Sequence, residues 1–287
     1  MATFDTDRLV DQVTLKGALP TGRFTDQEIL DLASDALISH IAPMLVASRE
    51  EYYVQVYDQS VTASQAAYPI PYRSLGMSLR EVKLIDGNRI LDLPRMEPED
   101  ITETSEGAVQ GFYLQANNVV LYPSPQASGQ TLRMTYFVRP STLVPVTSCG
   151  RITNISGQIL TASLPAIWST ADTFDLVQGK SGFTLKGQDL SAVAVSTSSI
   201  ELSATPPTTL SVGDYVCLAG ESCFPHIPAE AHQLLIHLTV VAALEAMGDA
   251  QGAALAQATA DRLKQNFGLL ISNRVQGAPR RFTSVLL

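Results

Sequence analysis

The sequence has few charged residues and few cysteines, and each shortage argues against a class of protein. Only 16% of its 287 residues are charged, and 28 acidic against 19 basic residues give a formal net charge of -9. A protein that binds nucleic acid through its phosphates needs clustered lysine and arginine, so that class is not expected. At 45% hydrophobic residues, the chain is also too apolar for a disordered protein.

Cysteine occurs only at Cys149, Cys217 and Cys223, and no two of them form a C-x-x-C pair. An odd number leaves one disulfide open, but reduced thiols in a protein folded in the cytoplasm are the expectation. We expect no metal site and no cofactor. The N-terminus lacks the basic region and apolar core of a secretory signal.

The chain also lacks an apolar run long enough for a bilayer, which takes roughly 20 residues. Its longest run, LLIHLTVVAAL at residues 234–244, is about half that and contains His237 and Thr239. We therefore expect no membrane span and interpret this run as a packing helix. His232 and His237 are five residues apart, whereas helical metal pairs are four apart, so a metal role is not favoured.

Three helices are predicted. The first begins with a capping box at Thr25 and Glu28 and should end or kink near Pro43. The second begins near Pro228 and stops at Gly248, and the third covers about 250–271. Apolar spacing predicts these buried stripes: Ile29, Ala33, Ala36, Leu37, His40 and Met44; Leu234, Leu235, Leu238, Val241 and Ala242, with Ile236, Val240 and Leu244 on a second face; and Ala256, Ala260, Leu263, Phe267 and Leu270.

Between the helices, short alternating segments with glycine and asparagine turns predict β-structure. Hairpins are expected at Asp86-Gly87, Asn117-Asn118 and Ser156-Gly157, and Trp168 is expected to anchor the second β-segment. The predicted class is α+β: one N-terminal and two C-terminal helices with a long β-rich insertion, its second half a small barrel or sandwich. The expected parts are an N-terminal arm at 1–24, a helical core at 25–50 and 226–272, β-segments at 51–145 and 146–225, and a C-terminal arm at 273–287.

No catalytic constellation emerges. The G-x-S-x-G elbow, the G-x-G-x-x-G fingerprint and the phosphate-binding P-loop are absent. The acidic stretch MEPEDITETSEG at 96–107 is read as a solvated loop, since no aromatic cluster near it marks a ligand cleft. The last fifteen residues combine basic and apolar side chains, which suits an arm that either packs on its own domain or docks on a partner: Arg274, Arg280, Arg281, Phe282, Val285, Leu286 and Leu287.

Four stretches together resemble the head-to-tail adaptor, or connector, proteins of tailed bacteriophages. They are FTDQEILDLASDALISHIAPMLVASREEYYV, AYPIPYRSLGMSLREVKLID, GFYLQANNVVLYPSP and IPAEAHQLLIHLTVVAALEAMGD. In that family a late helix begins after P-x-E and often ends near GD, which here are Pro228, Glu230, Gly248 and Asp249. The second β-segment looks like an elaboration of the family pattern.

The resemblance implies a structural virion protein of the neck between head and tail, assembled in the host cytoplasm. It implies a homo-oligomeric ring, usually of 12 copies, that binds the portal, extends the DNA channel and carries the tail or nozzle. The C-terminal arm would reach the portal. DNA would pass an acidic face, with Asp26, Glu28, Asp31 and Asp35 as candidates. Helix packing or subunit contacts would involve Ile29, Ala33, Leu37, Leu234, Leu238, Val241 and Leu244. The alternatives are a tail or nozzle component and an envelope-degrading hydrolase.

Overall fold

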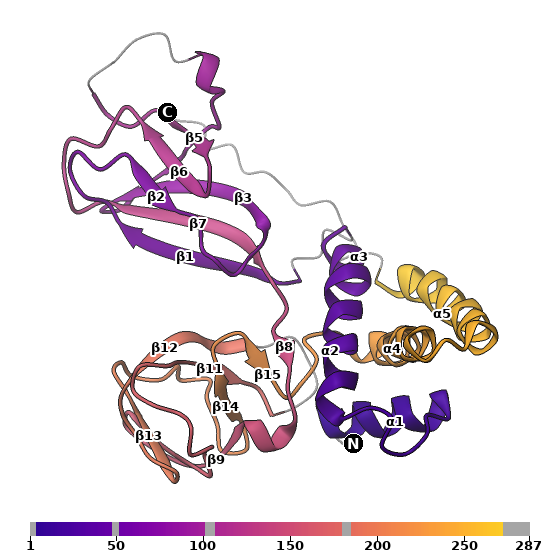
Figure 1. The fold of residues 1–287 in the computed structure, drawn as a ribbon. Helices are drawn as coiled ribbons and strands as arrows, with labels where there is room; N and C mark the ends of the chain where they lie inside the picture. The colour runs from indigo at the N-terminus through magenta and orange to yellow at the C-terminus, as the bar shows by residue number, and fades with distance from the viewer. Residues whose placement is uncertain (1–3, 48–51, 101–106, 180–184, 272–287) are drawn as a thin grey trace. The chain divides into compact units, whose positions relative to one another are not determined.

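The computed structural model describes residues 4–47, 52–100, 107–179 and 185–271 (Figure 1). The chain divides into two compact units. The first joins Met1–Glu50 to Ser141–Leu287, and the second is the inserted segment Glu51–Pro140. Helices near both ends and strands between them confirm the predicted α+β class.

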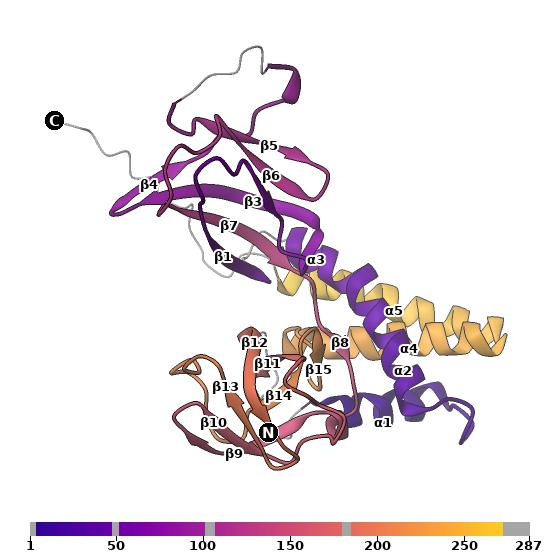
Figure 2. The same cartoon turned by 60° about the vertical axis from the view of Figure 1, so that its left-hand side comes forward.

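The helices of the first unit pack around α4. The helix α4 contacts α1, α2 and α5, and both views show α5 beside it (Figures 1 and 2). Because α4 is apolar on nearly all sides, it needs cover from several neighbours. The elements are α1 (Thr6–Gly17), α2 (Asp26–Ala36), the π-helical turn η1 (Leu37–Ile41), α3 (Ala42–Ala47), the 3-10 turn η4 (Ala229–Ala231), α4 (His232–Met247) and α5 (Ala250–Leu270).

Two predicted helix ends are present, whereas the first helix continues through Pro43 to Ala47. Thr25 and Glu28 form the capping box of α2, and Gly248 ends α4 in the left-handed conformation at φ 79°. A left-handed residue at this position favours glycine because it has no Cβ to clash.

The predicted stripe of the first helix is wrong beyond Leu37. His40 is exposed and Met44 only half-buried, while Ile41 and Leu45 are fully buried. The π-helical turn explains the change, because the Ala42 N–H donates to the Leu37 carbonyl, five residues back, and so shifts the buried face by one residue. In α5, Leu270 is likewise 67% exposed, and Ile271 is buried in its place.

α2, η1 and α3 form one continuous helix, Asp26–Ala47, which is long and apolar enough to cross a membrane by length and composition alone. Half of its most apolar window is buried inside the chain. A core helix passes the same test, and this one packs on α4.

Six antiparallel strands of the first unit close into a barrel in the order β10-β13-β12-β11-β14-β9. The sequence left barrel and sandwich open, and the structure is a barrel. Trp168 lies in its core, 5.3 Å from Phe174 between ring centroids. The strands are β9 (Gly150–Ser156), β10 (Ile159–Ala162), β11 (Thr173–Val177), β12 (Leu185–Val195), β13 (Ser199–Leu202) and β14 (Tyr215–Leu218).

Two short strands, β8 (Thr142–Leu143) and β15 (Glu221–Ser222), form a separate parallel pair in this unit, and a 3-10 turn, η3 (Val146–Ser148), leads into the barrel.

The second unit consists of two antiparallel sheets that share one core. One sheet has the order β1-β7-β3-β4 and the other β2-β6-β5. Buried residues of both, such as Leu84, Met134 and Leu121, form a single cluster. The strands are β1 (Val54–Ser60), β2 (Ala67–Pro69), β3 (Ser74–Asp86), β4 (Arg89–Asp92), β5 (Gly111–Gln115), β6 (Asn118–Tyr122) and β7 (Thr131–Val138), with a 3-10 turn, η2 (Pro98–Asp100), between β4 and β5.

Candidate interaction surfaces

The predicted packing residues are buried within one chain. None is more than 8% exposed, so α1, α2, α4 and α5 already cover them and leave little of their surface for a second subunit. They are Ile29, Ala33, Leu37, Leu234, Leu238, Val241 and Leu244.

The helix α1 was not predicted from the sequence, and it lies within the expected N-terminal arm of residues 1–24. Asp5 caps it by accepting a bond from the Arg8 N–H at 3.0 Å. Leu9, Val10 and Val13 form its buried stripe. The signal was present as an N-cap aspartate followed by apolar residues at helical spacing.

The start of α1 is tied to segments far away in the sequence. The Thr6 N–H donates to the Cys223 carbonyl at 3.0 Å, and the Thr6 hydroxyl donates to the Val144 carbonyl at 2.8 Å. The Phe4 ring stacks on His232 with centroids 3.9 Å apart. The N-terminal helix is therefore fastened to both the β8 segment and α4.

The two histidines of α4 serve packing and do not meet each other. Burial lowers the pKa of His232 to about 4. Burial and then the Lys16 ammonium lower the pKa of His237, whose Nε2 lies 3.4 Å from the Lys16 Nζ. Both rings are therefore neutral near pH 7.

The four predicted channel-facing acids are all exposed, but they do not share one face. At 100° per residue, Glu28, Asp31 and Asp35 lie within about 60° of one another on α2, and Asp26 lies on the opposite side. Bonds from the Thr25 N–H and hydroxyl, helped by Arg23, lower the pKa of Glu28 despite the opposing effect of burial. The acidic face of α2 therefore consists of Glu28, Asp31 and Asp35.

Three exposed leucines lie on one side of α5, and sequence reasoning did not find them. Leu255, Leu269 and Leu270 are 69%, 76% and 67% exposed. Their positions fall within about 100° around the helix, over about 20 Å of its length. Between Leu255 and the Leu269–Leu270 pair, the same side carries Thr259, Arg262 and Asn266. Ala253, Ala260 and Phe267 form the opposite, buried stripe. We call these three leucines the α5 stripe.

A buried hydrogen bond joins α2 to the strand β8. The Leu143 N–H donates to the Ser34 hydroxyl at 2.9 Å, and Ser34 is itself 5% exposed. Ser34 also donates to the Leu30 carbonyl at 2.8 Å. The Ser34 hydroxyl of α2 thus accepts the hydrogen bond of the buried Leu143 N–H in β8, so this amide stays paired in the core.

Buried carboxylates in the barrel hold loops. Asp214 accepts bonds from Lys186, Ser211 and the Gly179 N–H. Burial by itself would raise the pKa of Asp214, but these bonds together hold it below its ordinary value. Asp175 accepts from the Asp189 and Gly220 N–H groups, both at 3.0 Å. These bonds give both acids a structural role.

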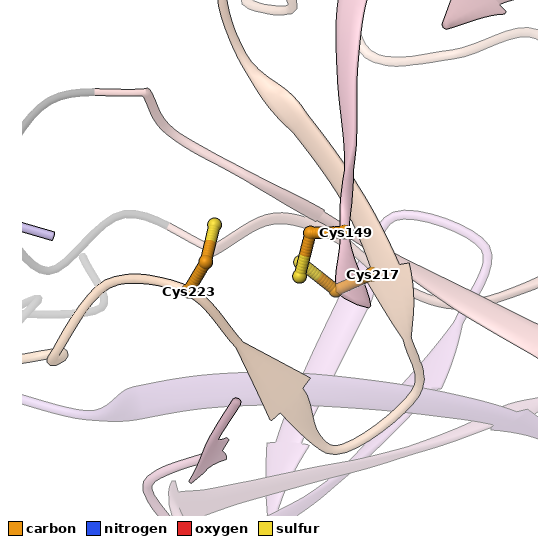
Figure 3. Close-up of side chains that lie close together, drawn as sticks. All are labelled: Cys149, Cys217 and Cys223. Carbon is orange, nitrogen blue, oxygen red and sulfur yellow. The ribbon is translucent and has the colours of Figure 1, made fainter. Parts of the chain in front are cut away.

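The three cysteines, separated in sequence, lie together in the structure. Their sulfur atoms are all within 4.8 Å of one another. The Cys217 thiol bonds to the Cys149 sulfur at 2.8 Å, and Cys223 faces this pair from the segment after β15 (Figure 3). Among the described residues this is the one group of His, Cys, Asp and Glu with metal-binding proximity.

The predicted portal-binding residues lie outside the described residues. They are Arg274, Arg280, Arg281, Phe282, Val285, Leu286 and Leu287.

Comparison with known proteins gives one family. The model of the family described as SU10 adaptor protein matches residues 6–173, more than half of the chain. The match runs from α1 through the second unit to the start of β11. No curated protein matches the chain.

Proposed function

Because the chain belongs to the SU10 adaptor protein family of phages, we propose that it is a virion component of the neck that forms a ring between portal and tail. In this role the ring, of about 12 copies as the resemblance to connector proteins implies, extends the DNA channel and gives the tail or nozzle a platform. The proposed role is structural. The buried carboxylates of Asp214 and Asp175 are consistent with it, because both hold loops of the barrel in place. The family match carries the proposal.

The α5 stripe supports the ring. Single exposed leucines are ordinary, but three on one side of a helix offer a partner apolar contacts at both ends of α5, with Thr259, Arg262 and Asn266 between them for polar contacts. In a closed ring each subunit presents one surface to the neighbour before it and a different surface to the neighbour after it, so the α5 stripe would supply one side of each contact and a second surface of the neighbour the other side. We propose that the α5 stripe meets the neighbouring subunit.

The α5 stripe can be tested by charge insertion. Leu255→Glu should prevent ring formation on portal-bearing heads, because the interface would bury an unpaired carboxylate. Ile167→Glu is the matched control, since Ile167 is 85% exposed on the barrel segment. Native mass and electron microscopy of the complexes distinguish the two. Rings of normal mass with Leu255→Glu would refute this interface while leaving the family role intact.

The C-terminal arm is proposed to bind the portal. Arg274, Arg280 and Arg281 concentrate positive charge on an acidic protein, and the last residues are apolar. Deleting 273–287 should leave a folded protein that no longer joins portal-bearing heads, measured by co-sedimentation. Normal co-sedimentation of the truncated protein would reject the arm.

The acidic face of α2 is proposed to line the channel, where repulsion keeps passing DNA from adhering. Substituting Asp31 and Asp35 with lysine should slow DNA release from otherwise normal particles, and more strongly at low salt. Asp26→Lys, on the other side of α2, is the control. Equal DNA release from wild-type particles, from those with lysine at Asp31 and Asp35, and from the Asp26→Lys control would show that this face does not line the channel.

A further inference from the structure

The cysteine cluster is a built site that the adaptor role does not use. Cys149 is 6% exposed, and Cys217 and Cys223 are fully buried. Their neighbours are apolar, among them Val144, Val177 and Phe224.

The strand register brings two of the cysteines directly opposite each other. Val216 of β14 pairs with Gly150 of β9 in antiparallel orientation, so the next position places Cys217 across from Cys149. Facing residues of antiparallel strands have Cα atoms roughly 4.5–5.5 Å apart. A disulfide needs a Cα separation of about 4.4–6.8 Å, so the backbone here accepts one without moving.

The same geometry argues against a metal ion. Two thiolates on one tetrahedral zinc, with Zn–S bonds of about 2.3 Å, lie about 3.8 Å apart. The sulfur atoms of Cys149 and Cys217 are 2.8 Å apart.

We propose that Cys149 and Cys217 form a dithiol modification site, which a low-molecular-weight disulfide converts into a cystine bridge between β9 and β14. Cys149 is the most exposed of the three, so its thiolate attacks first. It forms a mixed disulfide and releases one thiol from the oxidant. The Cys217 thiolate then attacks the Cys149 sulfur and releases the second thiol, so two protein thiols and one disulfide give one bridge and two small thiols.

The bridge has a definite structural consequence. It joins positions 68 residues apart in the sequence, so it restricts the unfolded chain across the whole barrel. Loop-closure arguments predict that oxidation raises the barrel's Tm by roughly 10 °C. Because the thiols have high pKa values and are buried, the reaction should be slow and should accelerate with pH. This inference does not depend on ring formation.

The test uses the full chain and oxidised glutathione, at pH 8 and in mild urea below the unfolding transition. Intact mass should show the loss of two hydrogens. Trypsin with a glutamyl endopeptidase, which cuts after Glu221, separates Cys217 from Cys223. The map should show a Cys149–Cys217 cross-link, and reduction should reverse the Tm rise measured by Trp168 fluorescence.

Matched variants identify the pair. Cys223→Ala should still lose two hydrogens, whereas Cys149→Ala and Cys217→Ala should not. The wild-type map does not depend on any variant folding. No mass loss, a cross-link mainly through Cys223, or only a stable glutathione adduct would overturn the proposal. If the protein bound one Co²⁺ per chain with a thiolate absorption band, and the bound ion protected the cysteines from oxidation, the site would be a metal site and the proposal would be overturned.

Discussion

Replacing Asp214 with asparagine should destabilise the barrel by about 3–5 kcal/mol, the usual cost of removing one partner of a buried ion pair. The side chains of Lys186 and Asp214 are 9% and 5% exposed, and their Nζ and Oδ2 atoms are 2.7 Å apart. Removing the carboxylate therefore leaves an ammonium in the interior with no counter-charge.

Asparagine cannot satisfy the same donors. Oδ2 of Asp214 accepts from Lys186 Nζ and from the N–H and hydroxyl of Ser211, while Oδ1 accepts from the Gly179 N–H. In either orientation, the asparagine NH₂ faces a donor. Lys186→Met should cost less than Asp214→Asn, because three neutral donors would still bind the carboxylate.

Trp168 provides the assay. It is the one tryptophan in the sequence, and it lies 7% exposed in the barrel core. Urea unfolding followed by its fluorescence therefore reports on the barrel. Asp58→Asn is the control: Asp58 accepts two bonds from Arg133 at 2.7 Å, but the side chains are 42% and 37% exposed. Its loss should be below about 1 kcal/mol by circular dichroism.

Acid should reveal the same pair. Because the folded-state pKa of Asp214 lies below its ordinary value of 3.8, the pair contributes fully above about pH 4 and is lost as the pH falls through the folded pKa. Asp214→Asn should flatten this part of the Tm curve. A cost below about 1 kcal/mol, or an unchanged acid slope, would refute the reasoning.

Three further predictions concern the helical core. Acidification from pH 7 to 4 should lower the free energy of unfolding by on the order of 2–3 kcal/mol through His232, because its pKa is about 4 in the folded chain and about 6.5 in the unfolded chain. The variant His232→Gln should lose less stability over this range, measured by urea unfolding followed by circular dichroism. Thr25→Ala should cost about 1 kcal/mol by removing the capping box of α2. Gly248→Ala should cost about 1 kcal/mol because φ is 79°.

The chain offers controls for the last two. Thr259→Ala, within α5, removes only a 3.3 Å bond to the Leu255 carbonyl and should not destabilise. Gly268→Ala, whose added Cβ meets nothing within 4 Å, should stabilise by a few tenths of a kcal/mol. If His232→Gln lost as much stability on acidification as the wild type, the argument for His232 would be wrong. If Thr25→Ala and Thr259→Ala changed stability equally, or Gly248→Ala and Gly268→Ala did, the argument for the cap or for the glycine would be wrong.

Local features could be read from the sequence because their causes lie within a few residues. Thr25 and Glu28 form a cap across three positions, and Gly248 stops a helix because of its own backbone freedom. The hairpin at Asp86-Gly87 likewise turns within one residue of its prediction, with Asp86 paired to Arg89. The acidic residues of α2 could be listed from the sequence, but only helical geometry separated Asp26 from the other three.

The sequence by itself determined the α+β class, the caps and turns, and the resemblance to connector proteins. The tertiary structure decided the rest, because long-range packing selects among local options of similar energy. A π-helical turn moved the buried face from His40 to Ile41. Closure of the barrel placed Cys217 against Cys149. No local pattern encodes that contact, since it depends on how strands far apart in the sequence pair.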